Sequence, residues 1–394
     1  MTTRVLSKRR YIAAKVLATF LSLIFAFLYS QDLGYERRSI LVYAFTLSSL
    51  IWIMLTSGST LTLRKLKANN SESNFGSFIA LILVETFVGL LVLAIGLTIF
   101  SNYKTIIPTP LIFLIYAYFL LSGLAMIMVE VLISYLQYLF SGYLELMAVG
   151  IQVFLFFLVL KPFDLSIAVR LLLSFNISYL IICVWMVKAI LSSMEEPFRI
   201  ASPVTFLKAT KGSHLIGVSL GIVDRIDRII IAFYFPTGTL AKYSVMSSLI
   251  AYFRFIPEFF SRIMISGFSL ALVVSRKMNV LFSILFTLIL AFIIAGSRIL
   301  ISSFLGSDWL LPVAIFVAFG VQEILRGVYQ LSLNYNSKLN LSHSTTIIPV
   351  VLLVFVAIFT SLLVHPLGLI GIPVAFSLAF CVAILLAYLW RQNV

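Results

Sequence analysis

The stretch GIVDRIDRIIIAFYF, residues 221–235, places two Asp-Arg pairs inside an otherwise apolar run. The charged residues are Asp224, Arg225, Asp227 and Arg228. In a continuous helix, where successive residues turn by about 100°, all of them fall on one face. Asp224 and Arg228 are spaced i, i+4 and can pair within the helix, which would make their charges structural. Arg225 and Asp227 then need partners from another helix or from a ligand. The carboxylates could carry a coupling proton or sodium ion, and the guanidinium groups could bind phosphate oxygens.

A second charged segment, IAYFRFIPEFFSRIM, follows at residues 250–264. It spaces Arg254, Glu258 and Arg262 four residues apart, which puts them on one helical face. Pro257 interrupts the backbone hydrogen bonds beside them and is predicted to act as a hinge. The two segments together hold four arginines and three acids, a net charge of +1. These charges are predicted either to face a cavity as functional groups or to form a structural ion-pair network between helices.

Three further charged sites stand inside apolar runs. Lys15 lies five residues after Arg10, so its ammonium group either reaches the membrane interface or faces a cavity. Glu85 is either a buried protonated acid or an ion-coupling site. Glu323 and Arg326 are spaced i, i+3 and are predicted to form a local pair. The two cysteines and three histidines are too scattered to indicate a disulfide or a metal site.

The elements that must carry these charges are membrane-spanning helices, because 62% of the 394 residues are hydrophobic and only 11% are charged. Twelve apolar runs come close to the roughly 20 residues that a bilayer core demands. They are 11–30, 39–57, 77–99, 107–130, 144–160, 166–188, 213–235 (the seventh span), 240–272 (the eighth span), 278–298, 309–333, 345–364 and 366–389.

Basic residues divide unequally between the two sides of the predicted membrane. With the N-terminus inside, fifteen basic residues fall in inner segments and five in outer ones, among them Arg37 and Arg38 between the first two spans. This bias predicts a multi-pass protein whose termini are both cytoplasmic. It also accounts for the net charge of +14 without a nucleic-acid partner.

The twelve spans divide into two halves of similar pattern. YAFTLSSLIW at 43–52 resembles YSVMSSLIAY at 243–252. We therefore predict an all-α protein with an N-terminal six-helix bundle at 1–190, a cytoplasmic linker at 191–212 and a C-terminal six-helix bundle at 213–394. Even-numbered halves keep the same orientation, so the repeats are expected to be parallel, with a cavity at their interface.

Residues 224–263 resemble the start of the second half of the Wzx-type O-antigen and exopolysaccharide flippases; their sequence is DRIDRIIIAFYFPTGTLAKYSVMSSLIAYFRFIPEFFSRI. These flippases form the polysaccharide transporter branch of the MATE-like MOP flippase superfamily. DLGYERRSILVYAFTLSSLIWIMLTSGSTLTLRK, 32–65, resembles the first two helices of the same family. The resemblance implies a MATE-like fold that moves an undecaprenyl-diphosphate-linked glycan across the bacterial inner membrane. It also implies a cationic cavity for the diphosphate, at Arg225, Arg228, Arg254 and Arg262, with Lys15 as a further candidate.

This reading predicts a transporter with no catalytic residue, metal or cofactor, coupled to a proton or sodium gradient. Asp224, Asp227, Glu258 and Glu85 would couple ions or compensate charge. Its partners would be membrane lipid, the lipid-linked glycan, a glycan polymerase and a chain-length regulator.

A drug or cation exporter of the same fold is one alternative, but the first two spans hold no carboxylate for a cation. A membrane glycan polymerase is another, but the predicted outer loops are short for a catalytic site. An unrelated solute symporter is a third.

Overall fold

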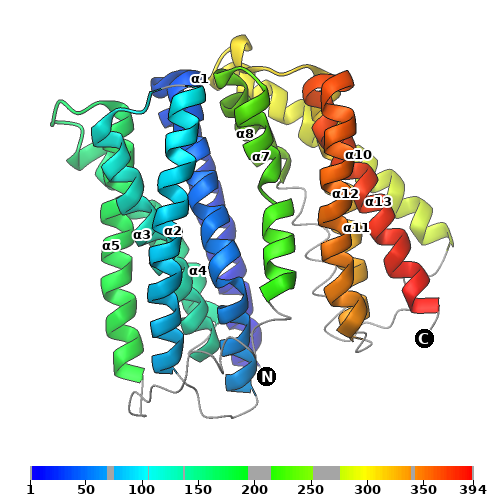
Figure 1. Cartoon of the computed structure of the whole chain (residues 1–394), viewed down its shortest axis with the longest axis horizontal. Helices are drawn as coiled ribbons and strands as arrows, with labels where there is room; N and C mark the ends of the chain where they lie inside the picture. The colour runs from blue at the N-terminus through cyan, green and yellow to red at the C-terminus, as the bar shows by residue number, and fades with distance from the viewer. Residues whose placement is uncertain are drawn as a thin grey trace. The chain divides into compact units, whose positions relative to one another are not determined.

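The computed structural model describes residues 2–68, 75–104, 106–135, 138–193, 214–251, 276–338 and 342–392. The chain forms two compact units, Met1–Gly221 (unit 1) and Ile222–Val394 (unit 2). Every regular element within the described ranges is a helix (Figure 1).

The helices of unit 1 follow one another with short connections. They are α1 (Thr2–Ala68), α2 (Phe75–Tyr103), α3 (Thr109–Tyr135), α4 (Tyr138–Phe154) with the π-helical turn η1 (Leu155–Val159), and α5 (Ile167–Ser193). The helix His214–Val223 begins at the end of this unit. Those of unit 2 are α7 (Ile226–Tyr234), α8 (Thr237–Ile250), α10 (Arg276–Phe304), η4 (Ser307–Trp309), α11 (Val313–Lys338), α12 (Ser342–Leu367), η5 (Gly368–Ile370) and α13 (Gly371–Gln392).

Six stretches of the described chain are long and apolar enough to cross a membrane. They are Val16–Thr56, Leu81–Tyr103, Thr109–Val129, Ile167–Lys188, Val313–Leu333 and Thr346–Trp390. The first and the last each hold two helices, joined at the Gly34 kink and at η5. The prediction of an all-α multi-pass membrane protein is therefore confirmed.

The first two predicted spans are one helical path in the structure. They meet without a separate loop at Gly34, whose φ of +70° favours glycine. The outer segment predicted to carry Arg38 is thus part of α1, and the Arg38 residue is only 5% exposed. Its Nη1 donates to the Ala26 carbonyl at 3.0 Å, and its guanidinium lies 5.3 Å from the centre of the Tyr29 ring. The Arg38 side chain thus reaches back across the kink to the helical segment before it.

The helices of unit 1 pack with small residues at their closest approaches. Trp52 of α1 donates its indole N–H to the Phe119 carbonyl of α3 at 2.7 Å. A Cβ on Gly123 would lie 1.7 Å from the same indole, so only glycine fits there. Tyr43 of α1 donates its hydroxyl to the Gly96 carbonyl of α2 at 3.1 Å. Hydrogen bonds from side chain to backbone thus hold α1 against both neighbours.

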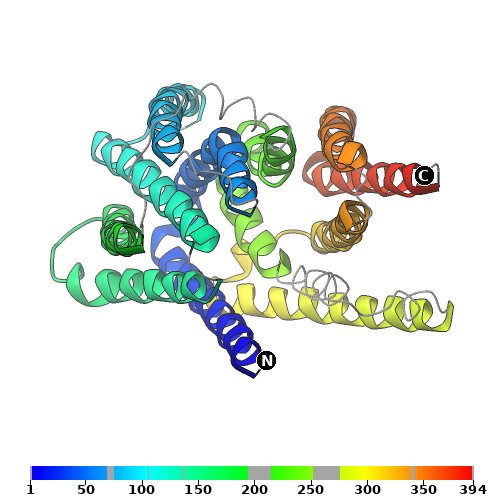
Figure 2. The same cartoon turned by 90° about the horizontal axis from the view of Figure 1, so that it is seen from below.

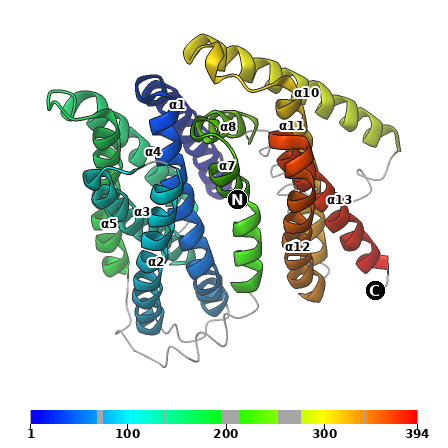
Figure 3. The same cartoon turned by 45° about the horizontal axis from the view of Figure 1, so that its top comes forward.

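In unit 2, α11, α12 and α13 lie side by side (Figure 2), and α10 runs crosswise to them (Figure 3). The buried Tyr243 of α8 packs edge-on against Phe319 of α11, with ring centres 5.6 Å apart. Tyr329 of α11 contacts Phe380 of α13, also at 5.6 Å. These aromatic contacts fix α11 between α8 and α13, and α11 carries two of the charged residues described next.

Candidate functional site

The seventh span is broken at its charged residues. The helix His214–Val223 ends, Asp224 and Arg225 form a turn, and α7 starts at Ile226. The Arg225 amide donates to the Ile222 carbonyl at 3.0 Å, and the Arg228 amide to the Arg225 carbonyl at 3.2 Å. The prediction of a continuous helix over 213–235, with all its charges on one face, is therefore wrong. A break inside an apolar span exposes backbone groups that can serve a ligand, as in discontinuous transporter helices.

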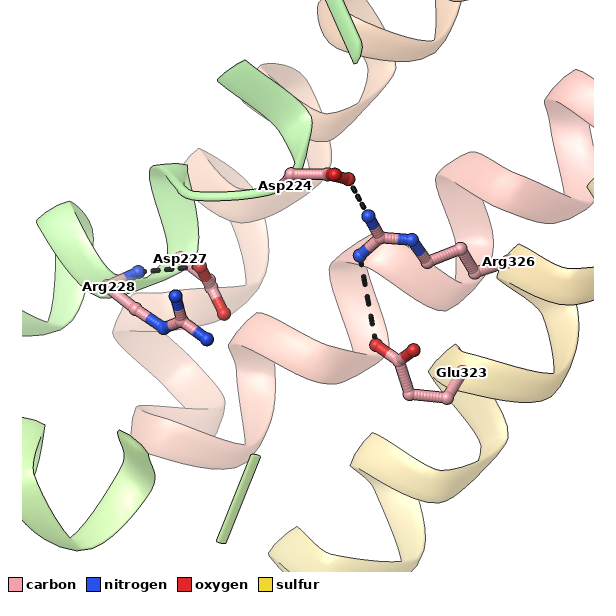
Figure 4. Close-up of polar contacts among 5 residues, drawn as sticks. All are labelled: Asp224, Asp227, Arg228, Glu323 and Arg326. Carbon is pink, nitrogen blue, oxygen red and sulfur yellow. Dashed lines mark hydrogen bonds and ion pairs between the residues drawn. The ribbon is translucent and has the colours of Figure 1, made fainter. Parts of the chain in front are cut away.

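Asp224 pairs with a residue far along the chain. Its carboxylate forms an ion pair with Nη2 of Arg326 on α11 (Figure 4). The pairing of Asp224 with Arg228 that the spacing allowed depends on a continuous helix, and the turn at Asp224 and Arg225 removes that i, i+4 geometry. The predicted local contact between Glu323 and Arg326 is present, with Oε1 and Nη1 3.8 Å apart. One buried guanidinium thus lies between two carboxylates.

Asp227 lies at the start of α7 and is only 6% exposed. Its Oδ1 accepts the Arg228 backbone N–H at 2.8 Å, so the carboxylate stabilises the beginning of the helix (Figure 4). Tyr243 of α8 is fully buried and lies near Asp227, Arg228 and Glu323. No hydrogen bond of standard geometry ends at the Tyr243 hydroxyl within the described part of the chain. Tyr243 was missed at the sequence level, since an aromatic residue in an apolar helix gives no distinguishing signal.

Arg225 and Arg228 are both half-buried. The Nε atom of Arg228 is buried and forms no hydrogen bond among the residues that the structure describes. A guanidinium in this position keeps hydrogen-bonding capacity that an oxyanion can use. These two arginines are the residues of the described site best suited to bind phosphate oxygens.

The described site is electrically balanced. The broken seventh span contributes two arginines and two aspartates and α11 contributes one arginine and one glutamate, which gives a formal net charge of zero. They are Arg225, Arg228 and Arg326 with Asp224, Asp227 and Glu323. The predicted charge of +1 counted Arg254, Glu258 and Arg262, which lie outside the described residues, as does Pro257. That net charge stays a prediction.

The remaining predicted site residues lie in unit 1. Glu85 is half-buried on α2, where it has a polar or electrostatic interaction. Lys15 belongs to α1, and its side chain lies outside the described side chains. The structure therefore brings Asp224, Asp227 and Arg228 into one cluster and adds residues of α8 and α11 to it.

No protein family and no curated protein matches this sequence. The fold, in contrast, matches solved membrane transporters over nearly the whole chain. A structure titled as the lipid II flippase MurJ, inward closed, is 15% identical with a TM-score of 0.67, covering 98% of this chain and 87% of that chain. The chain has the MOP-superfamily fold. A multidrug transporter of the MATE family, DinF-BH, matches at 14% identity and a TM-score of 0.67, covering 98% and 95%.

A third structure limits what the MOP-superfamily fold can tell about cargo. It is a MOP superfamily transporter from Pyrococcus furiosus, with 12% identity, a TM-score of 0.60 and coverage of 98% and 95%. That transporter is described as having a binding pocket of reversed polarity, which suggests a different function for it. At such identities the matches establish the fold, which confirms the predicted MATE-like architecture, and cargo must be argued from the site.

Proposed function

We propose that this protein is a flippase that moves an undecaprenyl-diphosphate-linked oligosaccharide, such as an O-antigen or exopolysaccharide repeat unit, from the cytoplasmic to the periplasmic leaflet. The transport would follow alternating access, the mode typical of parallel two-bundle transporters. The proposal assigns no catalytic step to any residue. It places the chain in a bacterial inner membrane with both termini in the cytoplasm.

One observation carries this proposal: Arg225 and Arg228 are half-buried at a helix break inside an apolar span. Each charge near a bilayer centre costs roughly 2.5–3.5 kcal/mol on insertion scales, so a span keeps such residues only where protein, water or ligand receives them. Guanidinium groups present planar donors that match diphosphate oxygens and stay charged at any cellular pH. A cationic pair at an opened backbone is therefore suited to an anionic lipid headgroup.

A gradient of protons or sodium ions is the proposed energy source. Asp227 is the described carboxylate best placed to carry the ion, because it is buried and lies directly beside Arg228. Glu85 in unit 1 and Glu258 remain the other candidates from the sequence. A glycan polymerase and a chain-length regulator are the expected functional partners, since they would consume the flipped glycan.

The test is surface glycan export in a strain that lacks its own copy of this gene. Arg225→Ala and Arg228→Ala should each abolish surface glycan and accumulate the lipid-linked precursor, with protein level near normal. Arg225→Lys should restore part of the export, because lysine keeps the charge but loses the planar donors. Lys161→Ala is the matched control, since it removes an exposed positive charge outside the site. Normal export by both alanine variants, or loss of the protein itself, would contradict the proposal.

A drug or cation exporter is the second candidate, because the multidrug transporter DinF-BH matches the fold with the same TM-score as the lipid II flippase. The buried acids Asp227 and Glu323 could receive an organic cation. Reconstituted vesicles distinguish the two functions. Gradient-driven movement of a cationic dye that Asp227→Asn abolishes would favour the exporter, and movement of a fluorescent lipid diphosphate would favour the flippase.

A further inference from the structure

Arg326 divides its two terminal nitrogens between two different acids. Nη2 pairs with Asp224 in the break of the seventh span, and Nη1 lies 3.8 Å from Glu323 one helical turn away on α11 (Figure 4). A guanidinium binds a single oxyanion most strongly when both nitrogens contact it side by side. Arg326 does not use that arrangement with either acid.

The two acids differ in their exposure. The Asp224 side chain is 42% exposed, whereas the Glu323 side chain is 0% and that of Arg326 is 6% exposed. Asp224 also sits in a two-residue turn between helices, so its backbone is less constrained than that of a residue within α11. Asp224 is therefore the acid that can leave Arg326 at the lower cost, while Glu323 stays and keeps a negative charge beside Arg326.

We propose that Arg326 is an additional anion-binding residue, and that Asp224 holds the position that a phosphate oxygen of a prenyl diphosphate headgroup takes on binding. The inference rests on the proposed function and adds a residue and an exchange step to it. When the headgroup displaces Asp224, the turn that carries Arg225 is released from α11. Binding of the lipid is thereby linked to a rearrangement of the broken span.

The charges around this exchange favour a reversible site. Glu323 lies 3.8 Å from Arg326 and the buried Asp227 lies at the start of α7, so the headgroup would enter a site that already contains acids. Asp224 competes with the ligand for Arg326, which weakens binding by the free energy of the displaced ion pair. A transported lipid must leave again, and a competing acid within the site makes its release easier.

The experiment measures binding of fluorescent farnesyl diphosphate to the purified full-length protein in detergent. Asp224→Asn removes the competing charge but keeps an acceptor for Arg326, and it should tighten binding about three- to fivefold, the equivalent of one half-exposed ion pair. Arg326→Lys should weaken binding about tenfold, because the paired donors are lost. In the Arg326→Lys background, Asp224→Asn should change the affinity by less than about twofold.

The controls separate this exchange from other effects. Asp308→Asn removes an exposed carboxylate on η4, away from any described ion pair, and should leave the affinity unchanged. Farnesol tests the lipid tail without the headgroup, and inorganic pyrophosphate tests the headgroup without the tail. A shift confined to pyrophosphate would assign the site to a free anion and overturn the lipid exchange.

The remaining outcomes distinguish the inference from the function on which it rests. If the wild type binds farnesyl diphosphate but Asp224→Asn binds it equally or more weakly, the ion pair is structural and the exchange is refuted while the flippase proposal stands. If the wild type does not bind farnesyl diphosphate at all, the proposed function falls together with the exchange.

Discussion

Removing one side or the other of the Asp224–Arg326 pair should have very different effects on stability. Arg326→Ala removes a compensating charge from Glu323, a carboxylate with 0% exposure, and breaking a buried pair in this way costs about 3–5 kcal/mol. Asp224→Asn affects a side chain that is 42% exposed and keeps an acceptor for Arg326, so it should cost about 1 kcal/mol or less. The measurement is equilibrium denaturation of each purified variant in detergent.

A double-mutant cycle tests the physical reason for this difference. Glu323→Gln/Arg326→Gln replaces the charged pair by neutral amides and should recover at least about 1–2 kcal/mol relative to Arg326→Gln alone. Lys161→Ala serves as a control for general loss of positive charge, because the side chain is exposed. Equal losses for Arg326→Ala and Asp224→Asn, or strict additivity in the cycle, would refute the argument from burial.

Three further predictions concern packing and ion coupling. Gly123→Ala places a Cβ 1.7 Å from the Trp52 indole and should lower the free energy of unfolding by about 1–3 kcal/mol. Gly150→Ala is the control, because its Cβ meets nothing within 4 Å and the change should be neutral or stabilising. Thermal melts of the two variants test this difference. Tyr243→Phe should change stability by less than about 1 kcal/mol, because the buried hydroxyl has no standard hydrogen bond among the described residues; a larger loss in denaturation would contradict this. Asp227→Asn should remove the gradient dependence of transport in vesicles but leave lipid-diphosphate binding intact; unaltered gradient dependence would exclude Asp227 as the coupling residue.

Apolar run length and spacing were sufficient to predict the fold class. A stretch of about 20 apolar residues in lipid forms a helix, because its backbone N–H and C=O groups can then hydrogen-bond to one another. The bounds of α2, α3, α5 and α11 follow the predicted spans closely. The kink at Gly34 was not predicted, because run length carries no information about how two spans join. Arg38 was placed in an outer segment for the same reason.

The candidate site was predicted only in its residue types. Helical geometry was assumed through Asp224 and Arg225, so the angular argument allowed Asp224 to pair with Arg228. Spacing within one helix indicates only contacts between residues three or four positions apart, such as Glu323 and Arg326. It gives no information on the contact between Asp224 and Arg326, which are far apart in the sequence. Tertiary packing decided that contact, since the aromatic pair of Tyr243 and Phe319 fixes α11 against α8.

The fold is shared by a lipid II flippase and a multidrug transporter, so the cargo must be argued from the site and not from the fold. The described cluster balances three arginines with three acids, and a balanced cluster attracts neither anion nor cation strongly over a distance. Selectivity between anionic and cationic cargo then depends on which acid separates from its arginine at the lowest free-energy cost. Asp224 is the exposed acid of the Arg326 network and Glu323 the fully buried one, so displacement of Asp224 uncovers a guanidinium for an anion while Glu323 stays beside Arg326. This asymmetry favours an anionic cargo. Glu323→Gln removes a carboxylate that repels the headgroup beside Arg326, so it should tighten the binding of fluorescent farnesyl diphosphate, and weaker binding would refute the reasoning.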